Sequence, residues 1–223
     1  MGYRLALLVT GASGMGLPVR ALQTLAAHEL VERVHLVVSS GAARVLHHEL
    51  ETSELGDGAK ALVSAAGLVP SAASKVRAHG DKELDAPIAS GSYRLDGSVV
   101  LPCSSSTLGA LAVGIADTLI RRAAAVAMKE RWPLVLGFRE TPLSLTHIEN
   151  MRRLAYQGAT LLPPMPAFYV GGGSLDRFLD AYVLRMLDCL SVATSLDSDL
   201  RWSGGSRDES PLTGRSGSKA RPR

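Results

Sequence analysis

The sequence predicts an α/β fold in which one doubly wound, mainly parallel sheet carries helices on both of its faces. Two observations support this fold class. Continuous apolar runs such as "RVHLVVS" (33–39) and "PLVLGF" (133–138) are typical of strands that are buried on both sides. Segments with helical character separate these runs, and parallel strands need such crossover connections.

The first part of the chain begins with a strand, a glycine turn and a helix within residues 3–30. A second buried strand follows at 33–39, and we expect a helix from about Gly41 to Glu51. Residues 53–86 carry a weaker pattern, in which a short helical piece near 59–66 precedes proline, serine and charged residues. We interpret this stretch as an insertion or a long connection.

The second part of the chain alternates again between strands and helices. The segment "GSVVLPCSSST" (97–107) predicts a strand that ends in a turn, and helical sequence continues from Leu108 to Arg131. After the strand at 133–138 we expect a helix at 145–158, and then a short strand that runs into a long loop at 159–173. A last helix begins after Ser174, a plausible N-cap. Its apolar stripe comprises Leu175, Phe178, Leu179, Tyr182, Val183, Met186, Leu187 and Leu190.

We expect residues 1–202 to form one domain and residues 203–223 to form a disordered tail. The tail is rich in serine, glycine, arginine and proline and shows no apolar period. It holds five basic and two acidic residues, which leaves 19 of each sign in residues 1–202. The net charge of +3 therefore belongs to the tail, and the neutral body does not predict nucleic-acid binding.

The chain is expected to be cytoplasmic and to make no use of a membrane. Its start, "MGYRLALLVTGASG", runs directly into a glycine turn and lacks the cleavage region of a signal peptide. No apolar run reaches the roughly 18 residues that a membrane span needs. The two cysteines, Cys103 and Cys189, are too few for a disulfide framework or a cysteine-rich zinc site.

Polar, glycine-rich turns follow the predicted strands. The first strand ends in "TGASG", the second in "SSG", and later ones in "PCSSST", "FRETP" and "PPMPAFY". Ligands of open α/β sheets bind beyond the carboxyl ends of the strands, and helix N-termini there favour anions. Any one of these turns could simply cap a helix. Taken together, they favour a site for a phosphate-bearing ligand.

Three common nucleotide-site patterns are absent. Gly11, Gly14 and Gly16 do not match the dinucleotide fingerprint G-x-G-x-x-G, and no lysine follows them as a P-loop requires. A short-chain reductase would need a tyrosine with a lysine four residues later, and no tyrosine of this chain has one. The sequence therefore disfavours an NAD-linked reductase.

Opposite charges stand next to each other at the end of the strand at 133–138. Side chains on a strand alternate between its two faces, so Arg139 and Glu140 cannot easily pair with one another. The two charges are therefore expected to serve different partners.

Other charged residues allow either a surface or a functional interpretation. Arg122 and Lys129 are seven residues apart and share a face of an otherwise apolar helix. Arg185 could pair with Asp188 at i+3, and Tyr169 could simply pack in its proline-rich loop. These residues would gain a common role if they converged on one phosphate.

Several of these segments together resemble the flavin prenyltransferases of the UbiX type, within the flavoprotein superfamily. The motifs are "TGASG", "ASGS" (89–92), "LPCSSSTL", "RRAAAVAMKERWPLVLGFRETPLS", "HIENM" and "PPMPAFY". The resemblance covers about residues 4–202 in one collinear order, and its longest motif runs from Lys129 to Leu143. It implies a Rossmann-like (flavodoxin-like) fold.

The resemblance also implies a reaction. Members of this family transfer the dimethylallyl group of dimethylallyl phosphate to N5 and C6 of reduced FMN, without a metal. The prenylated FMN that results serves a UbiD-type decarboxylase. A homo-oligomer is expected, commonly a dodecamer, with sites at the subunit junctions.

The resemblance assigns roles to residues at matching positions. Residues implied to bind FMN are Gly11, Ala12, Ser13, Ser39, Ser104, Ser105, Ser106, Thr107 and Arg139. Residues implied to bind dimethylallyl phosphate are Ser90, Gly91, Arg122, Lys129, Tyr169 and Arg185, some of them from a neighbouring subunit. Residues implied to act in catalysis are Ser13, Glu49, Lys129 and Glu140, with Glu51 a competitor for the place of Glu49. Trp202 matches a late tryptophan that could cover the isoprenoid.

These residue types suit the implied chemistry. Arginine, lysine and tyrosine can neutralise the phosphate that departs as an allylic cation develops. A carboxylate beside the flavin can relay a proton from N5 to the phosphate, and the small Ser13 could complete that relay. On this basis Arg139 is expected to face the flavin and Glu140 the prenyl phosphate.

The sequence departs from the family pattern in three places and leaves alternatives open. Ser40 stands where the family often has lysine, residues 53–85 match poorly, and the tail is unlike the family. A flavin-dependent decarboxylase of the cysteine-decarboxylase type would carry Pro-x-Met-Asn where this chain reads "PPMPAF". A non-catalytic FMN-binding subunit of a decarboxylase would not need a second phosphate pocket. The choice between a monophosphate and a pyrophosphate donor stays open.

Overall fold

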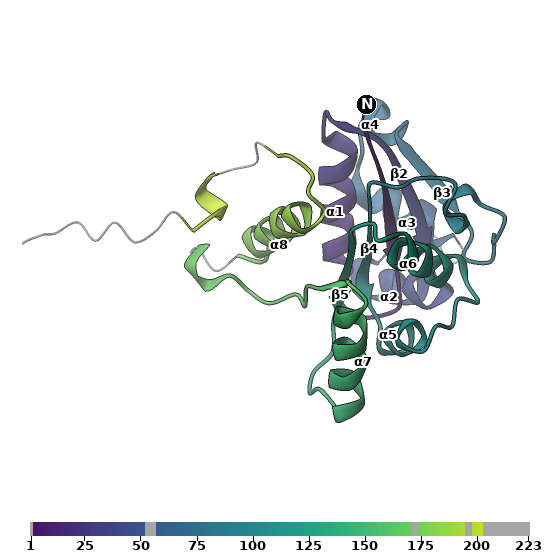
Figure 1. The fold of residues 1–223 in the computed structure, drawn as a ribbon. Coiled ribbons are helices and arrows are strands. Elements are labelled where there is room, and N and C mark those ends of the chain that lie inside the picture. Colours follow the sequence, from purple (N-terminus) through teal and green to yellow (C-terminus); the bar gives the residue numbers. More distant parts are fainter. Residues whose placement is uncertain (1, 52–56, 171–173, 195–197, 203–223) are drawn as a thin grey trace, which may run out of the picture.

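Six strands form one sheet in which all strand pairs are parallel, in the order β3-β2-β1-β4-β5-β6 (Figure 1). The computed structural model describes residues 2–51, 57–170, 174–194 and 198–202. The strands are β1 (Tyr3–Val9), β2 (Val31–Val38), β3 (Val76–His79), β4 (Gly97–Cys103), β5 (Leu134–Phe138) and β6 (Thr160–Leu161). The strand order reverses between β1 and β4, the point where a doubly wound sheet opens a crevice for ligands. The predicted fold class is confirmed.

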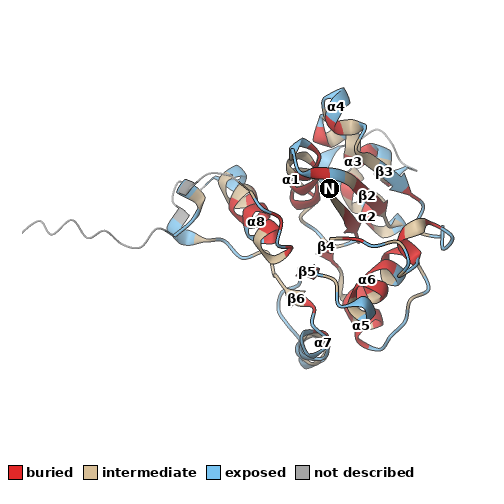
Figure 2. Ribbon diagram, turned by 45° about the horizontal axis from the view of Figure 1, so that its top comes forward, coloured by how far each residue is buried: buried red, intermediate tan, exposed pale blue. Residues whose placement is uncertain are grey.

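Helices cover both faces of the sheet (Figure 1). Helices α1 (Gly16–Ala27), α2 (Ser40–Leu50), α3 (Gly58–Ala66) and α8 (Leu175–Cys189) share one apolar cluster with the sheet. Helices α5 (Ser105–Ala112) and α6 (Leu119–Glu130) build the cluster on the other face, and α7 (Leu145–Tyr156) packs beside α5. Helix α7 is mostly exposed, and Leu154 is its one buried residue (Figure 2). The core is made mainly of leucine, valine and alanine, as the low aromatic content requires, and Phe138 and Tyr182 are buried in it as well.

Residues 53–86 contain a strand that the sequence interpretation missed. After α3 and the short helix α4 (Pro70–Ala73), β3 pairs with β2 as the edge of the sheet. This strand has four residues, and its Arg77 and Ala78 are exposed. A short edge strand has a neighbour on one side only, so it carries no continuous apolar run by which to recognise it. Residues 52–56 of this stretch lie outside the described ranges.

The helical sequence from Leu108 to Arg131 forms two helices, where one was expected. Helix α5 ends at Ala112, and Gly114 then adopts a φ of +79°, a left-handed conformation that favours glycine. Helix α6 begins at Leu119, with Thr118 accepting a hydrogen bond from the backbone N–H of Arg121. The break therefore combines a helix-ending glycine with a new N-cap.

The last helix confirms its predicted cap and most of its predicted core face. The Ser174 hydroxyl accepts a hydrogen bond from the Arg177 backbone N–H over 3.2 Å. Leu175 is the exception, because 70% of it is exposed. Helical spacing identifies which face of a helix is apolar, but it does not say how far along the helix the partner surface extends.

The tail predicted at residues 203–223 lies outside the described residues. Cys103 and Cys189 are both free thiols. Within the described ranges, every helix is too short or too polar to span a membrane.

Candidate functional site

A polar cavity of about 390 Å³ lies at the carboxyl ends of β1, β2 and β4. Its lining comes from the turns that follow these strands, from Asp81 and Lys82 after β3, and from the start of α6. The predicted flavin residues that line it are Gly11, Ser39, Ser104, Ser106 and Thr107. The cavity therefore brings together side chains from three separate turns, as expected for the switch point of a doubly wound sheet.

The cavity is built to attract an anion. Ser39, Ser104 and Thr118 are the N-caps of α2, α5 and α6, and all three line it. The helix-capping interpretation is thus correct for Ser39 and Ser104, and it does not compete with anion binding. Free backbone N–H groups and helix dipoles converge where N-termini meet.

Three basic residues at this cavity were missed by the sequence analysis. Arg44, Lys82 and Arg121 line it together with the acidic Asp81. Arg44 lies one helical turn after Ser40, the position where the family often has lysine. Isolated cations in three different segments form no sequence pattern, so only their spatial convergence could reveal them.

The glycine turn after β1 allows two backbones to approach closely. A Cβ atom at Gly11 would lie only 2.8 Å from the carbonyl carbon of Gly41. The turn is tied to β4 by Thr10, whose hydroxyl donates to the Pro102 carbonyl oxygen (2.7 Å) and accepts from the Ser104 N–H (2.8 Å). This arrangement fits a site where a ligand phosphate meets backbone rather than side chains.

Glu49, rather than Glu51, is the carboxylate at the glycine turn. Its carboxylate accepts hydrogen bonds from the backbone N–H groups of Gly14 (3.0 Å) and Met15 (2.7 Å), at the start of α1. Burial raises the pKa of Glu49, but these bonds, a bond to Ser13 and the charge of Arg139 outweigh it, so the pKa lies below its usual value. Glu51 follows the last residue of α2.

Arg139 and Glu140 serve different neighbours, as strand alternation predicted. The Glu140 carboxylate accepts from the Ser105 hydroxyl (2.8 Å) and from the Thr141 N–H (3.1 Å). These bonds and the charges of Arg139 and His147 lower the pKa of Glu140. The Nε of Arg139 is buried and has no hydrogen-bond partner among the described residues. A bound ligand or an ordered water can supply the acceptor that such a buried guanidinium nitrogen lacks.

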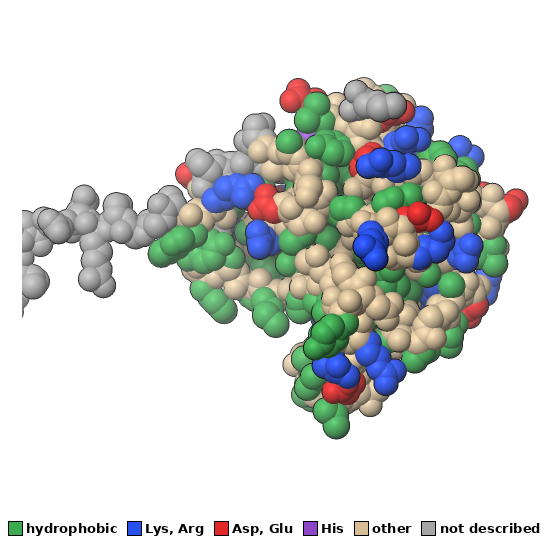
Figure 3. Space-filling model, in the orientation of Figure 1, with side chains coloured by type: hydrophobic (Ala, Val, Ile, Leu, Met, Phe, Trp, Pro, Cys, Tyr) green, Lys and Arg blue, Asp and Glu red, His purple; other side chains and the backbone are tan. Residues whose placement is uncertain are grey.

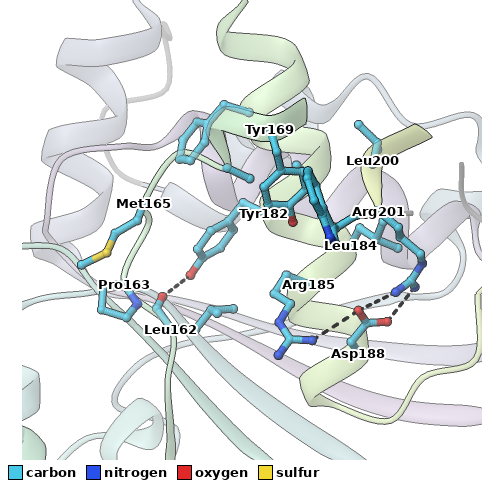
Figure 4. Close-up of a pocket in the computed structure, with 14 residues that line it drawn as sticks. Leu162, Pro163, Met165, Tyr169, Tyr182, Leu184, Arg185, Asp188, Leu200 and Arg201 are labelled. Carbon is cyan, nitrogen blue, oxygen red and sulfur yellow. Dashed lines mark hydrogen bonds and ion pairs between the residues drawn. The ribbon is translucent and has the colours of Figure 1, made fainter. Parts of the chain in front are cut away.

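A second cavity, of about 570 Å³, lies between α8 and the loop that follows β6 (Figure 4). Tyr169, Arg185 and Trp202, all singled out in the sequence, line it together with the unpredicted Arg201. The rings of Tyr169 and Trp202 meet edge to face with centroids 5.6 Å apart. Apolar side chains complete the lining, chiefly Leu162, Pro163, Met165, Phe178, Leu184 and Leu200.

Large hydrophobic side chains are exposed around the rim of this second cavity. Hydrophobic side chains gather on the side of the molecule where the loop and α8 lie (Figure 3). Exposed hydrophobic residues of this region are Met165, Phe168, Tyr169, Leu175 and Trp202. Apolar surface of this kind marks a ligand groove or a protein contact.

The remaining predicted residues form a third group that neither cavity includes. Arg122 donates from its Nε to the Ala89 carbonyl oxygen over 3.0 Å, and Lys129 pairs with Glu130. A Cβ atom at Gly91 would lie 2.8 Å from the Lys129 ammonium, so the "ASGS" loop and α6 are neighbours. One protomer thus brings Ser90, Gly91, Arg122 and Lys129 near each other but does not place them around the second cavity.

Comparison with known proteins defines the class of the protein. Residues 1–176 match the Flavoprotein family, so the chain is a flavoprotein of the α/β type. A flavin prenyltransferase UbiX from Synechocystis sp. is 40% identical over 213 residues, which cover 94% of this chain and 100% of that protein. The chain therefore belongs to the UbiX-type flavin prenyltransferase family.

Two solved structures extend this comparison. A crystal structure of AnUbiX (PadA1) in complex with FMN and dimethylallyl pyrophosphate has a TM-score of 0.77 and 37% identity, covering 92% of this chain and 100% of that one. A dodecameric FMN-dependent UbiX-like decarboxylase from Escherichia coli O157:H7 has a TM-score of 0.76 and 36% identity, covering 90% and 100%. The resemblance noted from the motifs is confirmed.

The residues present fit an FMN molecule. The phosphate of FMN suits the three helix N-termini and the cations Arg44, Lys82 and Arg121, because an anion there meets donors and positive charge. The unsatisfied Nε of Arg139 needs an acceptor, and a flavin ring system carries carbonyl oxygens. The absence of a Cβ at Gly11 leaves the two facing turns free of side chains between them.

Proposed function

We propose that this protein transfers the dimethylallyl group of dimethylallyl phosphate to N5 and C6 of reduced FMN. The observation that carries the proposal is the presence of two different cavities that suit anions in one fold. One is polar and lies at the carboxyl ends of the strands, and the other is mostly apolar and is lined by arginines as well. A protein that only stored flavin would have no use for the second.

The second cavity suits a prenyl phosphate in both of its parts. Its apolar lining can take the isoprenoid, whose transfer out of water is favourable, and Trp202 can cover it. Arg185 and the hydroxyl of Tyr169 can hold the phosphate and neutralise the charge that it gains as the C–O bond breaks. Stabilisation of a departing anion in this way accelerates bond cleavage without a metal.

The carboxylates suit the movement of protons. Reduced FMN supplies the nucleophilic N5 and C6 atoms. Glu140 is ionised at neutral pH, because Ser105 and Thr141 donate to it, so it can accept a proton and pass it to the phosphate. Glu49 is also ionised and contacts Ser13, which makes this pair the second candidate relay.

We infer that Ser90, Gly91, Arg122 and Lys129 act in the site of a neighbouring subunit. Their position apart from the second cavity supports this assignment, as does the exposed apolar surface around that cavity. The Escherichia coli relative is described as dodecameric, which makes a homo-oligomer with shared sites the natural assembly. Lys129 would then add positive charge next to the donor phosphate.

The recipient of the product and the cellular compartment are also proposals. We propose that the prenylated FMN passes to a UbiD-type decarboxylase, and that both proteins work in the cytoplasm. The donor in the AnUbiX complex is dimethylallyl pyrophosphate, so both donors need testing.

The test is anaerobic incubation of the protein with reduced FMN and either dimethylallyl phosphate or the pyrophosphate, followed by mass analysis of the released flavin. We expect a flavin that has gained one five-carbon unit. The Glu140→Gln and Arg185→Ala variants should form little of this product while still binding FMN. If the wild type binds FMN but never adds five carbons, the protein is a flavin-binding subunit rather than a transferase.

A further inference from the structure

Two guanidinium groups lie beside one carboxylate in the second cavity (Figure 4). Arg201 donates two hydrogen bonds to the carboxylate of Asp188, from Nη1 over 2.9 Å and from Nη2 over 2.7 Å. Arg185 lies on the same face of α8, three residues before Asp188, and its Nη1 is 3.7 Å from the same carboxylate. Asp188 is the least exposed of the three side chains, with 24% of its surface accessible.

The two arginines are bound to Asp188 to very different degrees. Arg201 makes the two-pronged contact that is the strongest arginine–carboxylate geometry. Arg185 is beyond hydrogen-bond distance, and within the described residues none of its five N–H donors has a hydrogen-bond partner. Its side chain is 68% exposed and lines the cavity. Arg185 is therefore the arginine whose N–H groups can donate hydrogen bonds to a phosphate.

This difference depends on Arg201. Asp188 stands at i+3 from Arg185, a spacing at which oppositely charged side chains on a helix readily pair. Each oxygen of the carboxylate accepts one hydrogen bond from Arg201, which partly neutralises its charge, and Arg185 stays at 3.7 Å. Without Arg201, the same carboxylate would be the nearest acceptor for Arg185 and would compete with a phosphate for it.

We propose that Arg201 is a positioning residue that occupies Asp188 and so leaves Arg185 free to bind the donor phosphate. The inference rests on the proposed function, because it concerns the residue that keeps Arg185 available for the phosphate of the prenyl donor. Arg201 reaches the site from beyond helix η3 (Ser198–Leu200), thirteen residues after Asp188 in the sequence. Arg201 itself need not touch the substrate.

A single and a double substitution test this role of Arg201. Arg201→Ala exposes Asp188 to Arg185 and should weaken donor binding about tenfold. The double variant Arg201→Ala/Asp188→Asn removes the competing charge as well, and it should recover donor affinity to within about threefold of the wild type. A role of the Arg201–Asp188 contact in holding the chain together would give the opposite result, because the double variant lacks that contact too.

The experiment measures the dissociation constant of dimethylallyl phosphate by calorimetry on the full chain loaded with oxidised FMN, where no transfer takes place. The same variants are then assayed with reduced FMN, and the Arg201→Ala change should appear in KM with kcat altered by less than about twofold. Arg152→Ala serves as the control, because Arg152 forms a comparable exposed i,i+3 pair with Glu149 on α7. This control should match the wild type.

Two results would overturn the inference alone. One is an Arg201→Ala variant that binds the donor as tightly as the wild type does. The other is a double variant that binds no better than Arg201→Ala. If the wild type itself does not bind the donor, the proposed function fails and the inference falls with it.

Discussion

The two cavities are built in different ways. The polar cavity at the carboxyl ends of the strands is formed mainly by turns that directly follow β1, β2 and β4. Hydrogen bonds such as the one from Thr10 to the Pro102 carbonyl oxygen connect the first of these turns to β4. The second cavity is formed by a loop, a helix and a short segment after it, and its Tyr169, Arg185 and Trp202 are exposed by half or more. The first cavity, which we propose to hold FMN and call the flavin cradle, is thus preorganised by the sheet, whereas the proposed prenyl phosphate site depends on contacts outside the sheet.

The strongest test of this difference is Glu140→Gln, which should affect turnover and spare the cradle. Loss of a proton-transferring carboxylate typically lowers the rate by 10²–10⁴-fold, and we expect a fall in kcat of about that size. FMN affinity should stay within about threefold, because Glu140 contacts Ser105 and Thr141 rather than the cavity lining. A Glu140→Gln variant that lost FMN affinity together with activity would show that the two cavities do not act separately.

The converse test is Gly11→Val, which should break the cradle and spare the donor pocket. Any Cβ at this position meets the Gly41 backbone at 2.8 Å, so the two turns must separate. We expect FMN affinity, measured by flavin fluorescence, to fall by more than about a hundredfold. Gly109→Ala is the matched control, because a Cβ there makes only an ordinary 3.5 Å contact with Asn150.

Acid should destabilise the sheet that carries the cradle. His35 on β2 is buried, and its two ring nitrogens contact His79 (2.9 Å) and Tyr93 (3.0 Å). Burial, followed by the charges of His79, Arg77, Arg33 and Arg4, lowers the pKa of His35 from 6.5 to about 4.

The sign of the effect follows from proton binding. Between pH 6.5 and about 4 the unfolded chain binds a proton at His35 that the folded chain does not, so stability falls as the pH falls through this window. The full loss is on the order of 3 kcal/mol. Urea unfolding at pH 7.5 and pH 5 should capture roughly 2 kcal/mol of this loss, because pH 5 lies inside the window. A His35→Asn variant should show a shallower pH dependence. An equal slope in both proteins would exclude His35 as the cause.

The smallest expected effect concerns the donor pocket. Tyr169→Phe removes one hydroxyl and keeps the ring that meets Trp202. One hydrogen bond to a charged phosphate contributes about 1.5 kcal/mol at the lower end of its usual range, so the KM for the donor should rise by roughly tenfold with flavin binding unchanged. Tyr156→Phe, at an 82% exposed position on α7, provides the comparison. An unchanged KM would show that the Tyr169 hydroxyl does not bind the donor phosphate.

Local sequence determined much of the fold and of the cradle. Buried parallel strands read as continuous apolar runs, and a turn after a strand carries its own cap residues, so the caps Ser39 and Ser104 could be expected from short stretches. The role of Glu140 was implied only by the family resemblance. The edge strand β3 could not be expected from a short stretch, because a strand of four residues with one neighbour has no such run. The flavin contact expected of Arg139 stays a prediction, supported by its unsatisfied Nε.

Only the tertiary structure decided which distant charges meet. The sequence alone predicted a phosphate site at the strand ends and separate roles for Arg139 and Glu140, because these follow from local periodicity. It could not show that Arg44, Lys82 and Arg121 face one cavity. Nor could it show that a single carboxylate, Asp188, takes two hydrogen bonds from Arg201 while Arg185 lies 3.7 Å from it. Periodicity specifies which way a side chain points from its own element, whereas the meeting of side chains depends on how the elements pack.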